Sequence, residues 1–254
     1  MKLEFICNLL RKFHTTFVKN LPSKVRIAEE HALSRHLIRY KVTMELLPRS
    51  HHKLKVIDIG SGWGHIAYLV QRIFGYEIVA VDTHRYFTPF WTRRFKALGI
   101  EFKFCDLTQD KLPFPNNSFD IALLCEVIEH LPIDPRVVLM DIRRVLKPKG
   151  VLILSTPNFA RLENRLKVLL GRPIEWYGDV FKGRVLGHIR EYTPEEVRDM
   201  LLKTGFKIDK EMLINYSPHA CLPRPLYNIV TKLIPKLREC ILVRAIASHD
   251  AGDP

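Results

Sequence analysis

Most of the chain alternates between two hydrophobic patterns, and each pattern predicts one kind of element. Seven short runs rich in apolar residues predict buried strands, at Lys55–Ile59, Glu77–Val81, Glu101–Phe104, Phe119–Cys125, Val151–Ser155, Lys207–Ile214 and Ile241–Ala247. Four segments between them have helical features and predict helices, at Gly64–Phe74, Phe87–Leu98, Pro135–Leu146 and Thr193–Thr204. Strands that alternate with helices predict an α/β fold with a doubly wound, seven-stranded, mostly parallel sheet.

The first 50 residues follow a different pattern and predict a helical cap. Apolar residues recur at roughly helical spacing over Leu3–Phe17, with lysines and arginines between them. Pro22 separates this helix from a second one at about Val25–Leu47. We therefore divide the chain into a cap, residues 1–50, and a core domain, residues 51–254. We expect the cap to cover the core domain, although a basic amphipathic helix also suits a membrane surface.

An irregular insert, about residues 157–190, interrupts the alternation after the fifth strand. It begins with a basic helix at about Leu162–Leu170 and mixes basic residues with aromatic ones. These residues are Arg161, Arg165, Lys167, Arg172, Lys182, Arg184 and Arg190, with Trp176, Tyr177 and Phe181. The mixture fits a phosphorylated, lipid-linked or nucleic-acid acceptor, so we expect the insert and the cap to form the acceptor pocket. A second apolar and basic segment, Leu222–Leu237, is broken by three prolines.

The charge balance narrows the classes of partner. Forty Lys and Arg against 27 Asp and Glu give a formal net charge of +13. Such a charge favours anionic partners, namely nucleic acid, an anionic membrane surface or a phosphorylated substrate, while a solvated basic surface is the simpler alternative. The five cysteines include no C-x-x-C pair, which favours a reducing compartment. Without an apolar run of about 18 residues, we expect a cytoplasmic location, with peripheral membrane contact left open.

A glycine-rich turn predicts a nucleotide-like ligand. Gly60, Gly62 and Gly64 lie between a predicted strand and a predicted helix, where a tight turn brings the backbone close to a ligand. Asp82, at the end of the second strand, suits both hydroxyls of a ribose. The spacing is G-x-G-x-G, with Asp58 two residues before the first glycine, whereas nicotinamide-dependent dehydrogenases carry G-x-G-x-x-G. An NAD-dependent oxidoreductase is therefore a disfavoured alternative.

Taken together and in order, these motifs resemble those of class I S-adenosylmethionine-dependent methyltransferases. The matching segments are Asp58–Gly64, Ala80–Asp82, Cys105–Leu107, Leu112–Asp120 and Leu146–Gly150, the last similar to an L-K-P-G-G turn with Lys149 replacing one glycine. The resemblance covers about Lys53 to Phe206 and implies a Rossmann-like fold with S-adenosylmethionine as cofactor. The cofactor would supply an activated methyl group, so the protein would contribute positioning and proton removal.

The resemblance also implies roles for individual residues. Gly60 and Gly62 would pass the methionine moiety, Asp58 would hold its amino group, Asp82 would bind the ribose, and Asp106 with Leu107 would meet the adenine. Cys125 and Glu126, at the end of the fourth strand, would border the methyl group, although Cys125 also suits a small core position. The predicted cofactor site further includes neighbours in the same motifs, namely Ser61, Gly64 and Thr83.

A second set of residues predicts the chemistry at the acceptor. Glu126, Glu129 and His130 follow the fourth strand, and His188 follows the insert. This pattern resembles two metal-assisted groups, the small-RNA 3′-terminal 2′-O-methyltransferases and the O-methyltransferases of ubiquinone biosynthesis, so one expectation is a divalent metal bound by all four residues. Metal-independent methyltransferases carry similar segments, with the histidine near the sulfonium and the second glutamate capping a helix.

Without a metal, the catalytic set would be His130, His188 and Glu129, with one of the two imidazoles as general base. We therefore expect methyl transfer to a hydroxyl of a small-molecule, lipid-linked or glycan acceptor, similar to the ubiquinone-biosynthesis enzymes. An RNA 2′-O-methyltransferase with metal assistance is an alternative, although the other recognition domains of the small-RNA enzymes are not evident. A non-catalytic, cofactor-binding partner subunit is a further alternative.

Overall fold

The computed structural model describes residues 1–17, 23–83, 88–174, 187–216 and 222–248. Seven strands form one sheet in the order β3-β2-β1-β4-β5-β7-β6. They are β1 Lys55–Ile59, β2 Glu77–Asp82, β3 Glu101–Phe104, β4 Phe119–Cys125, β5 Leu146–Pro157, β6 Phe206–Ile214 and β7 Cys240–Ala247. All neighbours are parallel except at β7, which runs antiparallel to β5 and β6. The predicted fold class is therefore confirmed.

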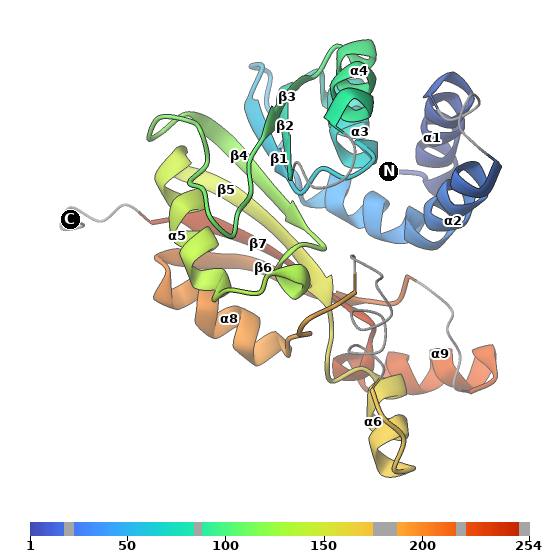
Figure 1. The fold of residues 1–254 in the computed structure, drawn as a ribbon. Coiled ribbons are helices and arrows are strands. Elements are labelled where there is room, and N and C mark those ends of the chain that lie inside the picture. The colour runs from blue at the N-terminus through green and yellow to red at the C-terminus, as the bar shows by residue number, and fades with distance from the viewer. Residues whose placement is uncertain (18–22, 84–87, 175–186, 217–221, 249–254) are drawn as a thin grey trace.

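Helices cover both faces of the sheet (Figure 1). The helices of the described residues are α1 Leu3–Phe17, α2 Ser23–Leu46, α3 His65–Phe74, α4 Thr88–Leu98, α5 Pro135–Val145, α6 Leu162–Leu169, α8 Pro194–Lys203 and α9 Arg224–Leu233, with 3₁₀ turns η1 Ile128–His130 and η2 Pro235–Leu237. Successive strand residues join different cores, because side chains alternate between the faces of a strand. Val56 and Ile121 belong to the core beneath α1–α4, whereas Ile57 and Ala122 belong to the core beneath α5 and α8.

The N-terminal cap packs on the core domain through its apolar side. Ile6, Leu10 and Phe13 of α1 are completely buried and join the same core as residues of α3. The ring of Phe13 lies 4.8 Å from that of His65, the first residue of α3. The core therefore covers the apolar side of α1 at these three positions, while Leu3 and Phe5 are 39% and 49% exposed. In the described part of the chain, no helix is long and apolar enough to cross a bilayer.

The structure corrects the predicted start of the fifth strand. We expected a turn at Lys147–Gly150 and a strand from Val151, but β5 already begins at Leu146, where it pairs with Phe119. The register then shifts, so that Val151 pairs with Ile121, and Lys149 adopts φ +63°. The family-like turn is thus an irregularity within the strand, which periodicity does not reveal.

The structure also places a helix in the proline-containing segment. Pro223 is the N-cap of α9 and Pro225 lies in its first turn, where a missing N–H removes no helical hydrogen bond. The third proline, Pro235, follows the helix and begins η2. The three prolines therefore delimit α9 and do not break it. In Figure 1, α6 and α9 lie beyond the carboxyl ends of the central strands.

Candidate functional site

The glycine turn connects β1 to α3 and adopts backbone angles that favour glycine. Gly60 has φ +70°, and a Cβ built there would meet Cγ2 of Val127 at 2.4 Å. Gly62 has φ +49°, and a Cβ there would have no atom within 4 Å. Gly60 thus allows the turn to approach the segment after β4, whereas Gly62 faces open space. That open space is where the resemblance places the methionine moiety of the cofactor.

Two buried polar atoms beside the turn lack a partner among the described residues, and they are Oδ2 of Asp58 and Oγ of Ser61. Burial raises the pKa of Asp58 to about 7, with the nearby charge of Asp82 adding to the effect. A buried acceptor without a donor is costly unless a ligand completes it. A cationic amino group would satisfy Asp58 and favour its ionised form, which fits the role implied by the resemblance.

Asp82 supports the glycine turn from β2. Its Oδ2 accepts a hydrogen bond from the Gly62 amide at 2.7 Å, and its Oδ1 accepts one from the Thr83 amide at 2.7 Å. Burial raises the pKa of this carboxyl group, while the two amides favour its charged form. An ionised carboxylate accepts about four hydrogen bonds, so Asp82 retains the capacity to bind ribose hydroxyls.

The third predicted cofactor segment reaches the same edge of the sheet. The Cys105 amide donates to the Asp82 carbonyl oxygen at 3.0 Å, which brings the ends of β2 and β3 together. Asp106 follows, and its Oδ1 accepts from the amide and hydroxyl of Thr108 at 3.0 and 2.6 Å. Leu107 is partly buried. The carboxyl ends of parallel strands are where such folds bind ligands, and the residues present there fit S-adenosylmethionine.

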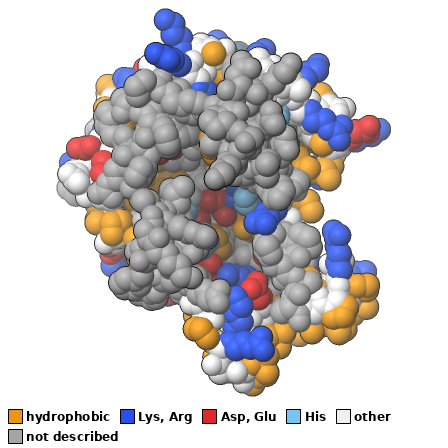
Figure 2. Space-filling view, turned by 45° about the vertical axis from the view of Figure 1, so that its right-hand side comes forward, with side chains coloured by type: hydrophobic (Ala, Val, Ile, Leu, Met, Phe, Trp, Pro, Cys, Tyr) orange, Lys and Arg blue, Asp and Glu red, His pale blue; other side chains and the backbone are white. Residues whose placement is uncertain are grey.

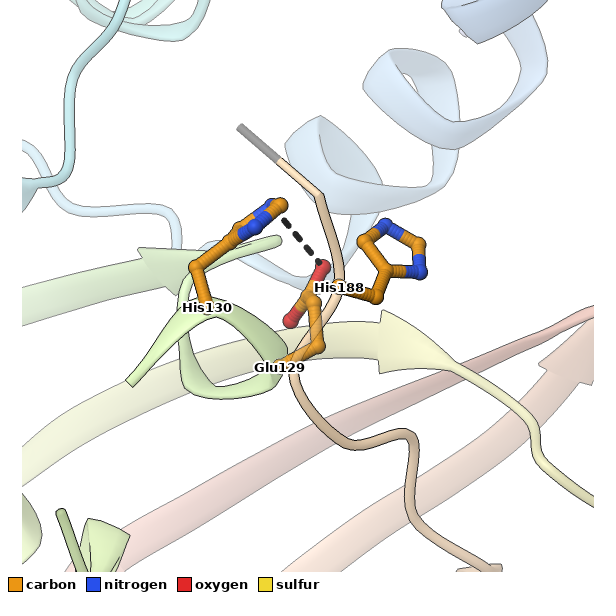
Figure 3. Close-up of side chains that lie close together, drawn as sticks. All are labelled: Glu129, His130 and His188. Carbon is orange, nitrogen blue, oxygen red and sulfur yellow. Dashed lines mark ion pairs between the residues drawn. The ribbon is translucent and has the colours of Figure 1, made fainter. Parts of the chain in front are cut away.

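A second cluster lies after β4 and joins two distant segments (Figure 3). Glu129 and His130 belong to η1, and His188 lies just before α8. Their potential ligand atoms lie within 4.8 Å of one another, and the two imidazole rings are 5.0 Å apart between centroids. Figure 2 shows acidic and histidine side chains together in a hollow of the surface. The structure thus brings together the three predicted catalytic residues.

The hydrogen bond of His130 determines which ring nitrogen is available. Its Nδ1 lies 3.2 Å from the carbonyl oxygen of Gly187. A carbonyl only accepts, so Nδ1 carries the proton and Nε2 keeps its lone pair. That Nε2 lies 4.0 Å from Oε1 of Glu129. Burial, with the neighbouring His188, lowers the pKa of His130, which favours the neutral ring.

His188 is oriented by a carboxylate that sequence reasoning missed. Its Nδ1 lies 3.0 Å from Oε1 of Glu191, which is also paired with Arg161. Burial alone would raise the pKa of Glu191, but His188 and Arg161 outweigh it and lower that pKa. Glu191 is therefore ionised and accepts from Nδ1–H of His188, so the lone pair of the neutral ring lies on Nε2. Only its spacing, three residues after His188, could have signalled this role.

Glu129 is completely buried, and its two carboxylate oxygens have different neighbours. Its Oε2 accepts from the Thr156 hydroxyl at 3.0 Å, while Oε1 has no hydrogen bond among the described residues. Burial, with the charge of Glu126, raises its pKa well above the ordinary value. The N-cap of α5, the next α-helix along the chain, is Asp134 and not Glu129.

Glu126 points elsewhere, so it does not join this cluster of three. Its Oε2 forms an ion pair with Nη1 of Arg39 at 2.5 Å, and its Oε1 accepts from the Ser155 hydroxyl at 2.9 Å. The backbone of Glu126 adopts φ +57°, which is uncommon for a residue with a Cβ. Arg39, on α2, is buried between the rings of Tyr40 and Tyr216, each 5.6 Å from its guanidinium carbon. Sequence reasoning missed this contact between cap and site.

Two further predictions concern Cys125 and the insert. Cys125 is buried, and burial raises the pKa of its thiol to about 12, so it is a neutral residue packed at the end of β4. The aromatic part of the insert, with Trp176, Tyr177, Phe181, Lys182 and Arg184, lies outside the described residues. The structure therefore describes the insert, predicted to help form the acceptor pocket, only at its two ends, residues 157–174 and 187–190.

Comparisons with known proteins agree with this geometry. Residues 57–154 match the family described as "Methyltransferase domain". A ubiquinone biosynthesis O-methyltransferase from Cereibacter sphaeroides is 26% identical over 162 residues, which cover 63% of this chain and 64% of that protein. The match thus spans less than two thirds of that relative.

Two solved structures show how far the fold alone can be interpreted. A methyltransferase from Archaeoglobus fulgidus that depends on S-adenosylmethionine has a TM-score of 0.61 and 17% identity, over 89% of this chain and 100% of its own. The [4+2]-cyclase SpnF has a TM-score of 0.58 and 17% identity, over 82% and 80%. The fold therefore does not by itself define a reaction. Residues 57–154 are thus similar to a methyltransferase domain, and the ordered motifs and the fold are similar to those of class I S-adenosylmethionine-dependent methyltransferases.

Proposed function

We propose that the protein transfers a methyl group from S-adenosylmethionine to a hydroxyl of a small-molecule, lipid-linked or glycan acceptor. The observation that carries this proposal is the pair of imidazoles at the carboxyl edge, each with Nδ1 hydrogen-bonded and with Nε2 making no hydrogen bond among the described residues. A hydroxyl requires such a base, because its oxygen is a weak nucleophile until the proton leaves. The similarity to ubiquinone biosynthesis O-methyltransferases supports the same class of acceptor.

Each group of residues has a defined task in this reaction. S-adenosylmethionine supplies a methyl group already activated on a sulfonium. Asp58 and Ser61 would hold its amino group, and Asp82 would hold its ribose. His188 accepts the acceptor's hydroxyl proton at Nε2 as the oxygen attacks, and the Glu191 carboxylate stabilises the resulting imidazolium. His130 lacks such a counter-charge on Nδ1 and is better suited to position the acceptor.

A metal-assisted reaction is the second candidate, and one observation favours it. Glu129, His130 and His188 provide one carboxylate and two imidazoles within 4.8 Å, which suits several divalent ions. Glu126 would join them only after leaving Arg39 and Ser155. If this candidate is correct, extensive chelation followed by dialysis abolishes turnover and a divalent ion restores it. Unchanged turnover after the same treatment would exclude it.

Labelled S-adenosylmethionine tests the proposed acceptor class. The purified protein is incubated with the labelled cofactor and a cell extract, and the extract is then separated into lipid, small-molecule, RNA and protein fractions. We expect label in the lipid or small-molecule fraction, and none with His188→Ala. Label confined to RNA would support the RNA 2′-O-methyltransferase alternative instead.

Binding measurements separate the remaining alternatives. Calorimetry with S-adenosylhomocysteine and with NAD distinguishes a methyltransferase site from an oxidoreductase site, because only the appropriate cofactor should give a saturable signal. Binding of S-adenosylhomocysteine without label transfer to any fraction would instead favour a non-catalytic partner subunit.

A further inference from the structure

An exposed apolar surface runs over two helices that lie outside the main cores. It consists of Val168, Leu169 and Leu170 at the end of α6 with Leu226, Ile229, Leu233 and Ile234 along α9, and we name it the α6–α9 surface. These side chains are between 47% and 80% exposed. They are seven of the fifteen large apolar side chains exposed in the described part of the chain, so the exposure is concentrated on these two helices.

The two helices are held by a small core of their own. Leu162 and Leu166 of α6 pack in one cluster with Tyr227 and Val230 of α9 and Leu237 of η2. On α9, the inward residues are three positions apart, while Leu226, Ile229 and Leu233 repeat at i, i+3 and i+7 on another side. The helices therefore have a buried apolar side that stabilises them and a second apolar side without a partner among the described residues.

Basic residues surround the α6–α9 surface almost without acidic ones. Residues 162–172 and 222–238 contain seven basic side chains, namely Arg165, Lys167, Arg172, Arg224, Lys232, Lys236 and Arg238. The single acidic side chain in these ranges, Glu163, is paired with Lys167 at 2.8 Å, and Glu195 of α8 is paired with Lys236 at 3.1 Å, so these two lysines are neutralised. Figure 2 shows hydrophobic side chains along the lower right of the molecule with Lys and Arg beside them. Apolar residues bordered by positive charge match the interface of an anionic bilayer.

The same two helices are fixed to the carboxyl edge of the sheet. The side-chain amide of Asn158, just after β5, donates through Nδ2 to the carbonyl oxygens of Lys236 and Arg238 at 3.0 and 2.7 Å. Arg161, the N-cap residue of α6, is paired with Glu191, the carboxylate that orients His188. The helices that carry the α6–α9 surface are therefore anchored to the same segments that carry the proposed methyl-transfer site.

We infer that the α6–α9 surface docks the protein onto an anionic lipid bilayer, so that an acceptor with a lipid tail reaches His188 from the membrane. Docking itself rests on the exposed residues alone, and only the acceptor's access rests on the proposed function. The bilayer is favoured over a second protein copy because basic residues outnumber acidic ones beside the surface and would repel their symmetry mates.

Vesicle flotation tests this docking without any methylation. The protein is mixed with phosphatidylcholine vesicles that contain about one third phosphatidylglycerol, or with phosphatidylcholine alone, at low and at high salt. We expect flotation with the anionic vesicles, and loss of flotation at high salt because ions screen the basic residues. Wild-type protein that stays in the soluble fraction with anionic vesicles would overturn the inference.

Matched variants assign the effect to this surface. Ile229→Glu with Leu233→Glu places two carboxylates on exposed positions of α9, and Leu202→Glu, on α8 and 55% exposed, is the control. We expect the pair to weaken vesicle binding at least about tenfold and the control to leave it unchanged. Arg224→Glu with Lys232→Glu should also weaken vesicle binding. Lys207→Glu with Lys210→Glu on β6 should leave it unchanged.

Two outcomes would contradict the assignment. Vesicle binding of the α9 variants equal to that of the wild type would show that another surface binds lipid. Dimerisation that depends on concentration and is abolished by Ile229→Glu with Leu233→Glu would assign the surface to a second copy. Binding of S-adenosylhomocysteine, measured without vesicles, shows that each variant is folded. Methylation of a short, soluble acceptor would test the proposed function independently of docking.

Discussion

The two halves of the candidate site are built in different ways. The cofactor half consists of residues close in sequence to the ends of β1 and β2, with Asp58, Gly60, Gly62 and Asp82 within 25 positions. The acceptor half combines residues from η1, the end of the insert and α2, with Arg39 and Glu191 about 150 positions apart. Local motifs are sufficient for the first half, whereas the second exists only through long-range contacts. Predictions that affect the two halves differently test this contrast.

The largest effect is expected at the acceptor half, from loss of His188. His188→Ala removes the proposed base, so we expect turnover to fall by about a hundredfold or more while affinity for S-adenosylhomocysteine stays constant. Steady-state kinetics and calorimetry provide the two measurements. Glu191→Gln should give a smaller fall in turnover, since the imidazole remains but loses its counter-charge. Near-normal turnover in His188→Ala would refute the assignment of the base.

The next effect concerns the contact between the cap and the acceptor half. Arg39→Met leaves Glu126 mostly buried without its cation, so we expect the free energy of unfolding to fall by about 2–4 kcal/mol. Glu126 retains some exposure and Ser155 as a partner, which keeps the loss below that of a completely buried charge. Chemical denaturation measures the change. Adding Glu126→Gln to Arg39→Met should recover part of the stability, and a double variant no more stable than Arg39→Met would disprove the pairing.

A smaller effect is expected at the cofactor half, from the charge of Asp58. Asp58→Asn should weaken binding of S-adenosylhomocysteine by roughly ten- to a hundredfold, because a charge-assisted hydrogen bond is lost. In the wild type the free carboxyl has a pKa of about 7, and a cationic amino group binds its ionised form better. Affinity should therefore fall as the pH decreases below about 7. Calorimetry between pH 5.5 and 8.5 measures this dependence, and its persistence in Asp58→Asn would contradict the assignment.

The smallest effects distinguish the two glycines of the turn. Gly60→Ala places a Cβ against Val127, so we expect a loss of about 1–3 kcal/mol in the free energy of unfolding. Gly62→Ala meets no atom, so its cost should be near 1 kcal/mol, from the backbone angle alone. We expect Gly62→Ala to reduce the binding free energy of S-adenosylhomocysteine by more than it reduces the free energy of unfolding. If the two variants lost equal stability and Gly62→Ala kept its affinity for S-adenosylhomocysteine, the interpretation that Gly62 faces open space for the cofactor would be contradicted.

The same contrast explains which predictions succeeded. The seven strands and the capping box at Thr193 follow from spacing within about ten residues, and the structure has both. The start of β5 at Leu146 depends on its partner Phe119, which lies 27 positions earlier. The sequence did not predict α9, because a proline fits a helix only in its first turn and the sequence does not show where that turn lies. In the structure, the packing of Tyr227 against Leu162 and Leu237 shows where the helix lies.

The sequence by itself determined the seven strands, the glycine turn with its two aspartates, and hence the resemblance to the methyltransferase family. These features depend on side-chain periodicity and on backbone angles that few residues adopt. Only the tertiary structure decided that Glu126 pairs with Arg39, that Glu191 orients His188, and that α6 and α9 expose one apolar surface. The physical reason is that a buried charge and an exposed helix face are defined by their neighbours in space, and those neighbours are far apart along the chain.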